Sequence, residues 1–264
     1  MKTLMIKPKE LKLASLKNKR PSRKDFSRLI TEDCVIKVPG HFRILYKRMD
    51  FDSVETIKAL KSINFSTHTR TGGLKTRSEL IGFKPRNARR IDACEISALA
   101  TKHHKQHEHF LGLAQMLAKV FKECLRPYFQ INEVLLKRKK ILDNYKIAGT
   151  PFTSGIINYN NPLGYHIDRG NIPNMLSCML VLKNSVTGGY LSLPQLDIGI
   201  ELQDKTILIF DGQNLIHGVT PISYADKYAY RYSFVFYSMY GMWNCLESDK
   251  ELERYQKILD TKSK

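Results

Sequence analysis

The spacing of apolar side chains changes about midway along the chain. In the first part, apolar positions recur at helical intervals: residues 57, 60 and 63 follow a possible capping box at Asp52 and Glu55, and the pattern resumes between Cys94 and Leu125. The stretch 131–145 is similar. These patterns predict a short helix after Asp52 and two longer helices that end before residue 149.

After Gly149-Thr150-Pro151 the apolar runs become short and rich in Ile, Val, Phe and Tyr. They include "TSGIIN", "MLSCMLVLK", "GGYLSLP", "IGIEL", "KTILIFD", "NLIHGV" and "AYRYSFVFYS", separated by Gly, Pro, Asn and Asp. About seven short strands at about ten-residue spacing are typical of a sandwich, jelly roll or barrel. A capping box at Ser248 and Glu251 predicts a final helix. We therefore expect an α+β protein with a β-rich C-terminal core.

Two segments lack such periodicity. Residues 1–28 are basic and poor in large apolar groups, which predicts a flexible arm that either orders on a polyanion or has no partner. Residues 66–93 combine turn residues with five arginines and are predicted to form a loop. The expected organisation is a basic arm at 1–28, a basic and mostly helical region at 29–148, and the β-rich core with its C-terminal helix at 149–264.

The charge follows this division. The chain has a net charge of +18, with 33 Lys and Arg against 14 Asp and Glu in residues 1–150, but 10 against 11 in residues 151–264. A basic region beside a near-neutral one favours a protein that holds a polyanion, because cationic side chains displace the counterions condensed on phosphates. Nucleic acid is the partner this predicts, although a lysine-rich solvated surface would look the same.

Cysteine use and hydropathy bear on the compartment. The five cysteines, at positions 34, 94, 124, 178 and 245, are odd in number and form no Cys-x-x-Cys pair, which argues against a disulfide framework or a structural zinc site. No apolar run approaches the roughly 20 residues of a membrane helix, and the N-terminus is too charged for a signal peptide. We expect an intracellular protein located where DNA is, in a nucleus or in a bacterial cytoplasm, without a membrane or protein partner.

Metal-binding chemistry is indicated by "GYHIDRGN". In an extended segment, side chains two residues apart point to one side, so His166 and Asp168 would converge. His217, at the end of the apolar run in "FDGQNLIHGV", supplies a third donor. Two histidines and one carboxylate form the facial triad of non-haem iron(II) oxygenases. A second pair, His103 and His107, shares a helical face, but such pairs are more often a solvated helix surface.

An anion-binding residue follows the triad. In "AYRYSFVFYS" the alternation of a strand puts Arg231 and Ser233 on the same face. An arginine on a half-buried strand is costly unless it meets an anion, and a small dicarboxylate that chelates iron at one end would provide one. An arginine that reaches solvent from an edge strand is the alternative.

Together these motifs resemble a known family. The runs "GTPFTSGIINYNNPLGYHIDRGN", "GGYLSLPQLDIGIEL", "ILIFDGQNLIHGVTPI" and "YRYSFVFYS", over residues 149–240, resemble the 2-oxoglutarate and Fe(II)-dependent dioxygenases of the TET and JBP type, which hydroxylate 5-methylpyrimidines in nucleic acid. The resemblance implies a double-stranded β-helix (jelly-roll or cupin-like) core with N-terminal helices packed on it. It implies that His166, Asp168 and His217 bind Fe(II), and that Arg231 and Ser233, assisted by Asn158, bind 2-oxoglutarate.

The resemblance also implies substrate contacts. An asparagine three positions after the metal aspartate falls on Asn171, and the aromatic residue that stacks on the base falls on Tyr237. TET enzymes place a second base-contacting histidine where this chain has Met239, which leaves cytosine and thymine both open. The basic stretch "RTGGLKTRSELIGFKPRNARR" is then expected to hold DNA. Its candidate contacts, which could instead cap helices or pair with acidic residues, are Arg77, Arg86, Arg89 and Arg90.

The expected activity is therefore hydroxylation of a pyrimidine 5-methyl group in DNA, with Fe(II), 2-oxoglutarate and dioxygen. The conversion of 5-methylcytosine to 5-hydroxymethylcytosine is the first hypothesis, and hydroxylation of thymine in the JBP manner is the second. Two alternatives stay open. One keeps the iron chemistry but acts on a substrate other than nucleic acid. The other is a basic nucleic-acid-binding module on a cupin-like scaffold without catalytic metal.

Overall fold

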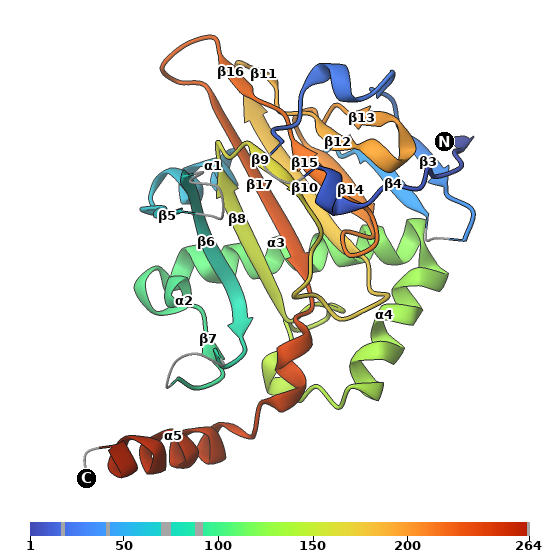
Figure 1. The fold of residues 1–264 in the computed structure, drawn as a ribbon. Coiled ribbons are helices and arrows are strands. Elements are labelled where there is room, and N and C mark those ends of the chain that lie inside the picture. The colour runs from blue at the N-terminus through green and yellow to red at the C-terminus, as the bar shows by residue number, and fades with distance from the viewer. Residues whose placement is uncertain (17–18, 41–42, 70–74, 88–91, 263–264) are drawn as a thin grey trace. The chain divides into compact units, whose positions relative to one another are not determined.

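The computed structural model describes residues 1–16, 19–40, 43–69, 75–87 and 92–262 (Figure 1). The chain divides into two compact units. Unit 1 comprises Met1–Glu79, Ile156–Arg169 and Leu176–Val235, and unit 2 comprises Leu80–Gly155, Gly170–Met175 and Phe236–Lys264. Among the described residues, no helix combines the length and apolar character needed to cross a membrane.

A large sheet and two smaller ones organise unit 1. The large sheet has the strand order β1-β3-β4-β14-β10-β17-β8-β6-β5, in which β6, β8 and β17 continue into unit 2. Its strands are β1 (Lys2–Met5), β3 (Cys34–Lys37), β4 (Ile44–Arg48), β14 (Thr206–Phe210), β10 (Ser177–Asn184), β17 (Tyr230–Tyr237), β8 (Ser154–Tyr159), β6 (Lys75–Lys84) and β5 (Ser66–Thr69).

The five-stranded sheet of unit 1 has the order β2-β13-β12-β15-β9. Its strands are β2 (Arg28–Ile30), β13 (Ile198–Ile200), β12 (Leu191–Leu193), β15 (His217–Val219) and β9 (Leu163–His166), and a separate pair is formed by β11 (Val186–Gly188) and β16 (Ile222–Tyr224). The remaining elements of unit 1 are α1 (Val54–Lys61), η1 (Leu13–Leu16), η2 (Arg23–Asp25) and η4 (Pro194–Leu196).

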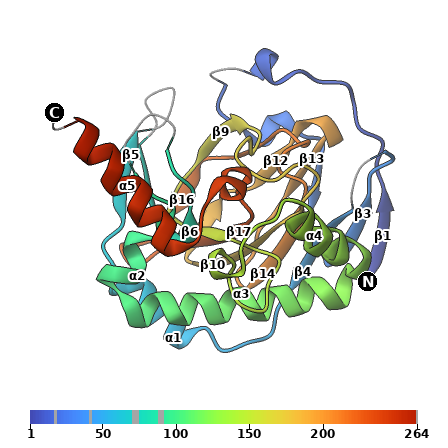
Figure 2. The same cartoon turned by 90° about the horizontal axis from the view of Figure 1, so that it is seen from below.

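The core of unit 1 lies between its two main sheets. Figures 1 and 2 show β9, β15, β12 and β13 facing β10 and β14. Alternate residues of both sheets point into the space between them, and the resulting cluster includes Ile44, Val181, Leu193, Ile198 and Phe210. The strands after residue 149 that the apolar runs predict are confirmed, because inward-facing Ile, Leu, Val and Phe side chains produce those runs.

Unit 2 is mainly helical. It contains β7 (Glu95–Ile96), α2 (Ala98–Lys102), α3 (His104–Cys124), α4 (Arg126–Arg138), η3 (Asp143–Tyr145), η5 (Tyr240–Asn244) and α5 (Ser248–Lys262). Figure 2 shows α2 and α3 end to end and α4 turning back from the end of α3. A core cluster joins Leu136 and Ile141 to Ile172, Met175 and Met242. The predicted final helix is confirmed as α5.

The helical region differs from its prediction in two places. The helix predicted at 131–145 is α4, which begins at Arg126 and ends at Arg138. Residues 94–125 do not form a single helix, because Glu95–Ile96 pairs with β6 and His103 breaks the path with a non-helical backbone. Nearby, His107 is buried and its Nε2 accepts a hydrogen bond from the backbone N–H of Gly82. Burial lowers the pKa of His107, so the imidazole is neutral. His107 is a core hydrogen-bond acceptor, which removes the ligand role considered for it.

The loop predicted at residues 66–93 is wrong over much of its length. Strands β5 and β6 form an antiparallel pair with Ser66 opposite Ser78 and Thr69 opposite Lys75. The residues buried in this part of β6 are Thr76 and Ser78, which alternate with exposed Lys75 and Arg77. Small hydroxyl side chains face inward there, so the alternation does not appear in hydropathy.

Parts of the predicted flexible arm form elements. Strand β1 pairs in parallel with β3, and β2 pairs in parallel with β13. Pro21 and Phe26 are buried. Strand pairing and these two buried apolar side chains therefore attach parts of residues 1–28 to the sheets of unit 1. The flexibility of residues 1–28 stays a prediction.

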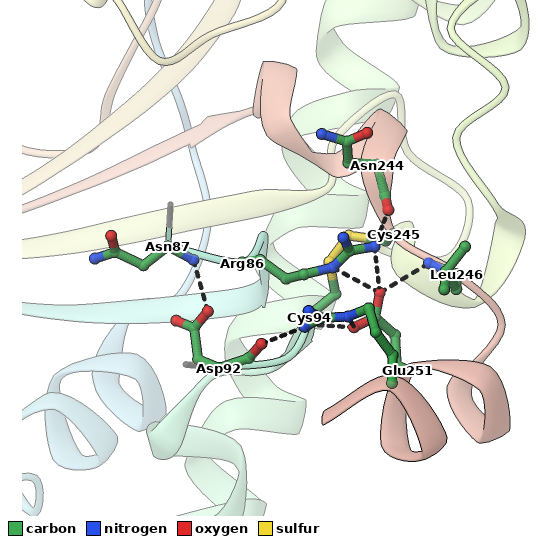
Figure 3. A network of polar contacts seen from close by, with 9 residues as sticks. Arg86, Asn87, Asp92, Cys94, Asn244, Cys245, Leu246 and Glu251 are labelled. Carbon is green, nitrogen blue, oxygen red and sulfur yellow. Dashed lines mark hydrogen bonds and ion pairs between the residues drawn. A yellow bond between two sulfur atoms is a disulfide. The ribbon is translucent and has the colours of Figure 1, made fainter. Parts of the chain in front are cut away.

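A disulfide and a buried ion pair lie together in unit 2 (Figure 3). Cys94 and Cys245 are joined across 151 residues of sequence, so the cysteine pattern that argued against a disulfide framework did not exclude a single disulfide. Beside them, Glu251 accepts hydrogen bonds from Arg86 and from the backbone N–H groups of Cys94 and Leu246. Glu251 was expected to cap its own helix, but its carboxylate is used for these tertiary contacts.

Candidate metal centre

The two histidines of the predicted triad lie on neighbouring strands of unit 1. His166 ends β9 and His217 begins β15, and the two residues are directly paired in the antiparallel register. Their ring centroids are 4.2 Å apart. Strand pairing therefore brings together two side chains that are about 50 positions apart in the sequence.

Asp168 completes the group. Its Oδ1 lies 3.7 Å from Nε2 of His166 and 3.7 Å from Nε2 of His217. The backbone N–H of Asp168 donates to the carbonyl of Gly212 at 2.8 Å, which ties the residue after β9 to the turn before β15. The donor atoms of all three side chains lie within 4.8 Å of one another, so small side-chain rotations would close them around one ion.

Backbone carbonyls orient both imidazoles. Nδ1 of His166 lies 2.9 Å from the carbonyl oxygen of Gly164, and Nδ1 of His217 lies 2.9 Å from that of Leu215. A carbonyl can only accept, so each Nδ1–H donates to its carbonyl, and each Nε2 is turned toward Asp168. Such a second hydrogen bond fixes the tautomer and the ring plane of metal-binding histidines. The three residues therefore offer two imidazole nitrogens and one carboxylate, a donor set that fits Fe(II).

Gly212 has no side chain, and the space beside it is occupied by the carboxylate of Asp168. A Cβ at this position would lie 2.2 Å from Oδ2 of Asp168 and 3.4 Å from Cε1 of His217. Any other residue would displace the aspartate. The sequence analysis did not identify Gly212 as part of the candidate site. Its position directly after the apolar run "ILIFD" and its terminal Asp211 was the signal that could have indicated it.

Arg231 is the predicted anion-binding residue of unit 1. It lies on β17 with 2% of its surface exposed, and its Nε has no hydrogen-bond partner. Burial lowers its pKa to about 10, so the guanidinium is still cationic at neutral pH. Gly189, which was also missed, makes room for it, since a Cβ there would lie 3.1 Å from Nε. A buried arginine with an unsatisfied donor is the arrangement that an incoming carboxylate would complete.

Ser233 and Asn158 are both buried, on the neighbouring strands β17 and β8. Ser233 is two residues from Arg231 on β17, and Asn158 lies on β8, the neighbouring strand in the sheet. Asn158 accepts a hydrogen bond from Asn161, whose side-chain amide also bonds both main-chain groups of Arg77. The side chain of Asn158 is thus held by the sheet.

The predicted base-contacting residues lie in unit 2. Asn171 is buried and forms an isolated antiparallel bridge with Met239. Backbone hydrogen bonds from Ile172 to Ser238 and from Tyr240 to Gly170 continue this pairing. Tyr237, at the end of β17, is half-buried and accepts from the backbone N–H of Thr153. Asn171 and the segment that follows Tyr237 are therefore neighbours within this unit.

The candidate DNA-contacting arginines are placed differently from one another. Arg77 is exposed on β6, and its guanidinium lies 4.1 Å from the ring centroid of Tyr159. Arg86 pairs with buried Glu251 at 2.7 Å and also donates to the carbonyl of Asn244. These contacts give Arg86 a structural role inside the protein, and its contact with DNA stays a prediction. Arg89 and Arg90 lie outside the described residues.

Two histidines and one carboxylate, presented by a fold with two facing sheets, are the donor set that non-haem iron(II) oxygenases use. Residues 84–240 match the Tet_JBP family model, described as the oxygenase domain of the 2OGFeDO superfamily. The match covers more than half of the chain, and the protein belongs to this family. Members of this superfamily use Fe(II) and 2-oxoglutarate.

Several known proteins are similar to this chain. The bifunctional helicase and thymine dioxygenase JBP2 of Leishmania braziliensis is 28% identical over 131 residues, which cover 48% of this chain and 12% of JBP2. The thymine dioxygenase JBP1 of Trypanosoma brucei brucei is 22% identical over 235 residues, 87% of this chain and 27% of JBP1. The chain thus spans a small part of these relatives.

Among solved structures, NgTET1 in complex with 5mC DNA has a similar fold. The TM-score is 0.63, with 16% sequence identity, and the similarity covers 88% of this chain and 87% of that one. At this identity the comparison establishes the architecture, a mixed α/β fold with large sheets.

Gly212→Ala is expected to weaken metal binding. The new methyl group would overlap Oδ2 of Asp168 and force the carboxylate out of the triad. Disturbing the orientation of metal ligands typically lowers the metal affinity by about 10- to 100-fold. Isothermal titration with Co(II) or Mn(II) would measure this loss. Gly170→Ala is the matched control, because a Cβ at Gly170 meets nothing within 4 Å. Equal affinities of the two variants would contradict the steric role of Gly212.

Proposed function

We propose that this protein is an Fe(II) and 2-oxoglutarate-dependent dioxygenase that hydroxylates the 5-methyl group of a pyrimidine in DNA. The observation that carries the proposal is the triad of His166, Asp168 and His217 with both Nδ1 atoms held by backbone carbonyls. The two facing sheets of unit 1 then form the double-stranded β-helix core. An intact and oriented donor set counts against a binding module that has lost its metal.

Each predicted site residue has a definite task in this proposal. His166, Asp168 and His217 would hold Fe(II), which would activate dioxygen, the oxidant, for cleavage of a strong C–H bond. The carbonyls of Gly164 and Leu215 would hold the two imidazole rings in orientation. Gly212 keeps the carboxylate in place.

Arg231 would bind the distal carboxylate of 2-oxoglutarate. The support is its burial, its positive charge and the unpartnered Nε. Ser233 would donate a further hydrogen bond to the same carboxylate, and Asn158 would assist. A cation that is held in a low-dielectric site before its ligand arrives loses little entropy when the ligand binds, which favours binding of this small dianion.

The DNA-binding part of the proposal rests on charge and on exposed side chains. The positive charge of the chain is concentrated in residues 1–150, and Arg77 presents an exposed guanidinium on β6. Access of a pyrimidine C5-methyl group to a protein-bound iron requires extrusion of the nucleotide, which costs a few kcal/mol. Asn171 would contact the edge of the flipped base and Tyr237 would stack on it. The enzyme would act inside the cell, where DNA and dioxygen are both present.

We propose 5-methylcytosine and thymine as the two candidate substrates, without an order between them. The similarity to JBP1 and JBP2, which are named as thymine dioxygenases, supports thymine as a candidate. The presence of Met239 in place of a polar base contact is compatible with either pyrimidine.

The test is incubation of the protein with Fe(II), 2-oxoglutarate, ascorbate and duplex DNA that contains both 5-methylcytosine and thymine. Digestion to nucleosides and mass spectrometry would then identify any hydroxymethyl product. A hydroxymethyl product that requires 2-oxoglutarate supports the proposal and names the base. Succinate formation without a modified nucleoside would retain the iron chemistry and refute DNA as the substrate.

Arg231→Met is expected to raise the KM for 2-oxoglutarate by about 10- to 100-fold, the amount that corresponds to loss of a charge-assisted hydrogen bond. The KM for DNA should not change. Arg77→Met is the matched control, since it removes an exposed arginine and should alter the KM for DNA and its salt dependence instead. An Arg231→Met enzyme with unaltered 2-oxoglutarate kinetics would contradict the assignment.

A further inference from the structure

The segment Lys19–Ser27, called here the N-terminal strap, lies on the outer side of the five-stranded sheet of unit 1. A capping box stiffens it, because Ser22 N–H donates to Asp25 and Lys24 N–H donates to Ser22. It continues directly into β2, which pairs with β13 at the edge of the sheet. The strap contacts the sheet at three places, and two of them are next to iron-binding histidines.

The first contact is made where the pairing of β9 with β15 is irregular. His217 pairs with His166 and Val219 pairs with Leu163, so Gly164 and Tyr165 together face Gly218 in a β-bulge. Pro21 packs on this bulge, since a Cβ at Gly218 would lie 2.5 Å from Cγ of Pro21. Gly218 directly follows His217, so Pro21 presses on the backbone beside this ligand.

The second contact holds the other strand of the bulge. The hydroxyl of Tyr165, the residue before His166, lies 2.8 Å from Oδ2 of Asp25 and 2.9 Å from Oγ of Ser192. Ser192 is paired with Gly218 in the register of β12 and β15. The phenol therefore links the strap to β9, which carries His166, and to β12, the strand that pairs with β15. The bulge also contains Gly164, whose carbonyl orients the imidazole of His166.

The third contact anchors the end of the strap. The ring of Phe26 lies against Gly199 of β13, where a Cβ would be 2.2 Å from two ring carbons. Tyr190 packs edge-on to this ring and the guanidinium of Arg23 lies 4.7 Å from its centroid. Phe26 is 3% exposed, so a small apolar cluster forms outside the sheet and holds the strap against it.

We propose that the N-terminal strap positions the metal ligands, with Asp25 and Tyr165 fixing the β9 bulge so that the Nε2 atoms of His166 and His217 face one ion. The proposal rests on the proposed iron site. Bulges beside active sites re-aim side chains, and a bulge without a second anchor has the freedom to slip. The Asp25 carboxylate and the Pro21 ring are that anchor. Asp25, Pro21 and Tyr165 act through the ligands and are positioning residues.

The test is Co(II) binding by isothermal titration to Tyr165→Phe, Asp25→Ala and the double variant of the full chain. Each single variant is expected to bind Co(II) about 10-fold more weakly, as loss of groups that orient ligands typically does. The double variant should be no weaker than the worse single variant, because both substitutions remove one link. The visible spectrum of bound Co(II), which reports coordination geometry, should change in parallel.

Ser27→Ala is the matched control. Ser27 is in the strap, but its backbone N–H and its hydroxyl donate to Asp197, the residue before β13. Its Co(II) affinity should equal that of the wild type, while the melting temperatures of all metal-free variants should stay close together. Wild-type Co(II) affinity in a folded Tyr165→Phe protein would overturn the strap proposal alone. Failure of the wild type itself to bind Co(II) would overturn both this proposal and the proposed function.

Discussion

Asp168→Ala is expected to abolish formation of hydroxymethyl nucleosides while leaving the affinity for DNA unchanged. Asp168 is the only charged donor of the triad, and its Oδ1 lies 3.7 Å from each histidine Nε2. Loss of a group that only orients a metal ligand lowers the metal affinity by about 10- to 100-fold. Loss of the anionic ligand itself should lower it by at least the upper end of that range. Co(II) titration would measure the metal affinity, and nucleoside mass spectrometry would measure product.

The matched control for this variant is Asp226→Ala. Asp226 is an exposed carboxylate in the turn before β17, and it accepts a hydrogen bond from the backbone N–H of Tyr228 in the same turn. The control should retain metal binding and product formation. An Asp168→Ala enzyme that still hydroxylates DNA would refute the triad, and a variant that loses DNA affinity as well would indicate a folding defect instead.

The triad could be predicted because its chemistry leaves a local trace. His-x-Asp uses the two-residue repeat of an extended chain, and His217 stands at the end of an apolar run that is long enough to be a strand. The same alternation places Arg231 and Ser233 on one face. These residues are recognisable since function requires particular polar types within otherwise apolar strands.

The glycines and carbonyls that complete the site could not be predicted in this way. Gly212 and Gly189 matter because of what a Cβ would touch, namely Asp168 in one case and Arg231 in the other. Such steric relations depend on three-dimensional packing between segments far apart in sequence. The Gly164 and Leu215 carbonyls that orient the histidines likewise carry no side-chain signal.

Two larger misreadings have one physical cause. Strand β6 was taken for a loop because Thr76 and Ser78 face inward, and β1 and β2 were missed because they have only four and three residues. Short or polar strands are stabilised by backbone pairing with partners already in a sheet, which hydropathy does not register. Pairing of Cys94 with Cys245 is equally a tertiary event, since 151 residues separate them.

The largest effect on stability is expected for Glu251→Ala. The Glu251 side chain is 2% exposed and pairs with Arg86, whose side chain is 24% exposed, at 2.7 Å (Figure 3). Burial alone would raise the pKa of Glu251, but hydrogen bonds from Leu246, Arg86 and Cys94 lower it below its usual value. Removal of one partner leaves the other charge uncompensated, which costs about 3–5 kcal/mol for a buried pair.

Urea unfolding followed by the fluorescence of Trp243 would measure this effect, because Trp243 is the only tryptophan of the chain and lies in η5, two residues from Cys245. Glu253→Ala is the matched control, an exposed glutamate on the same helix. A reducing agent removes the disulfide, so under reducing conditions the Glu251→Ala variant should lose η5 and α5 first. Because the folded-state pKa of Glu251 is depressed, its contribution to the free energy of unfolding is present above about pH 4.5 and is lost as the pH falls through the lower folded-state value.

Equal unfolding midpoints for the Glu251→Ala and Glu253→Ala variants would mean that the buried ion pair does not hold α5.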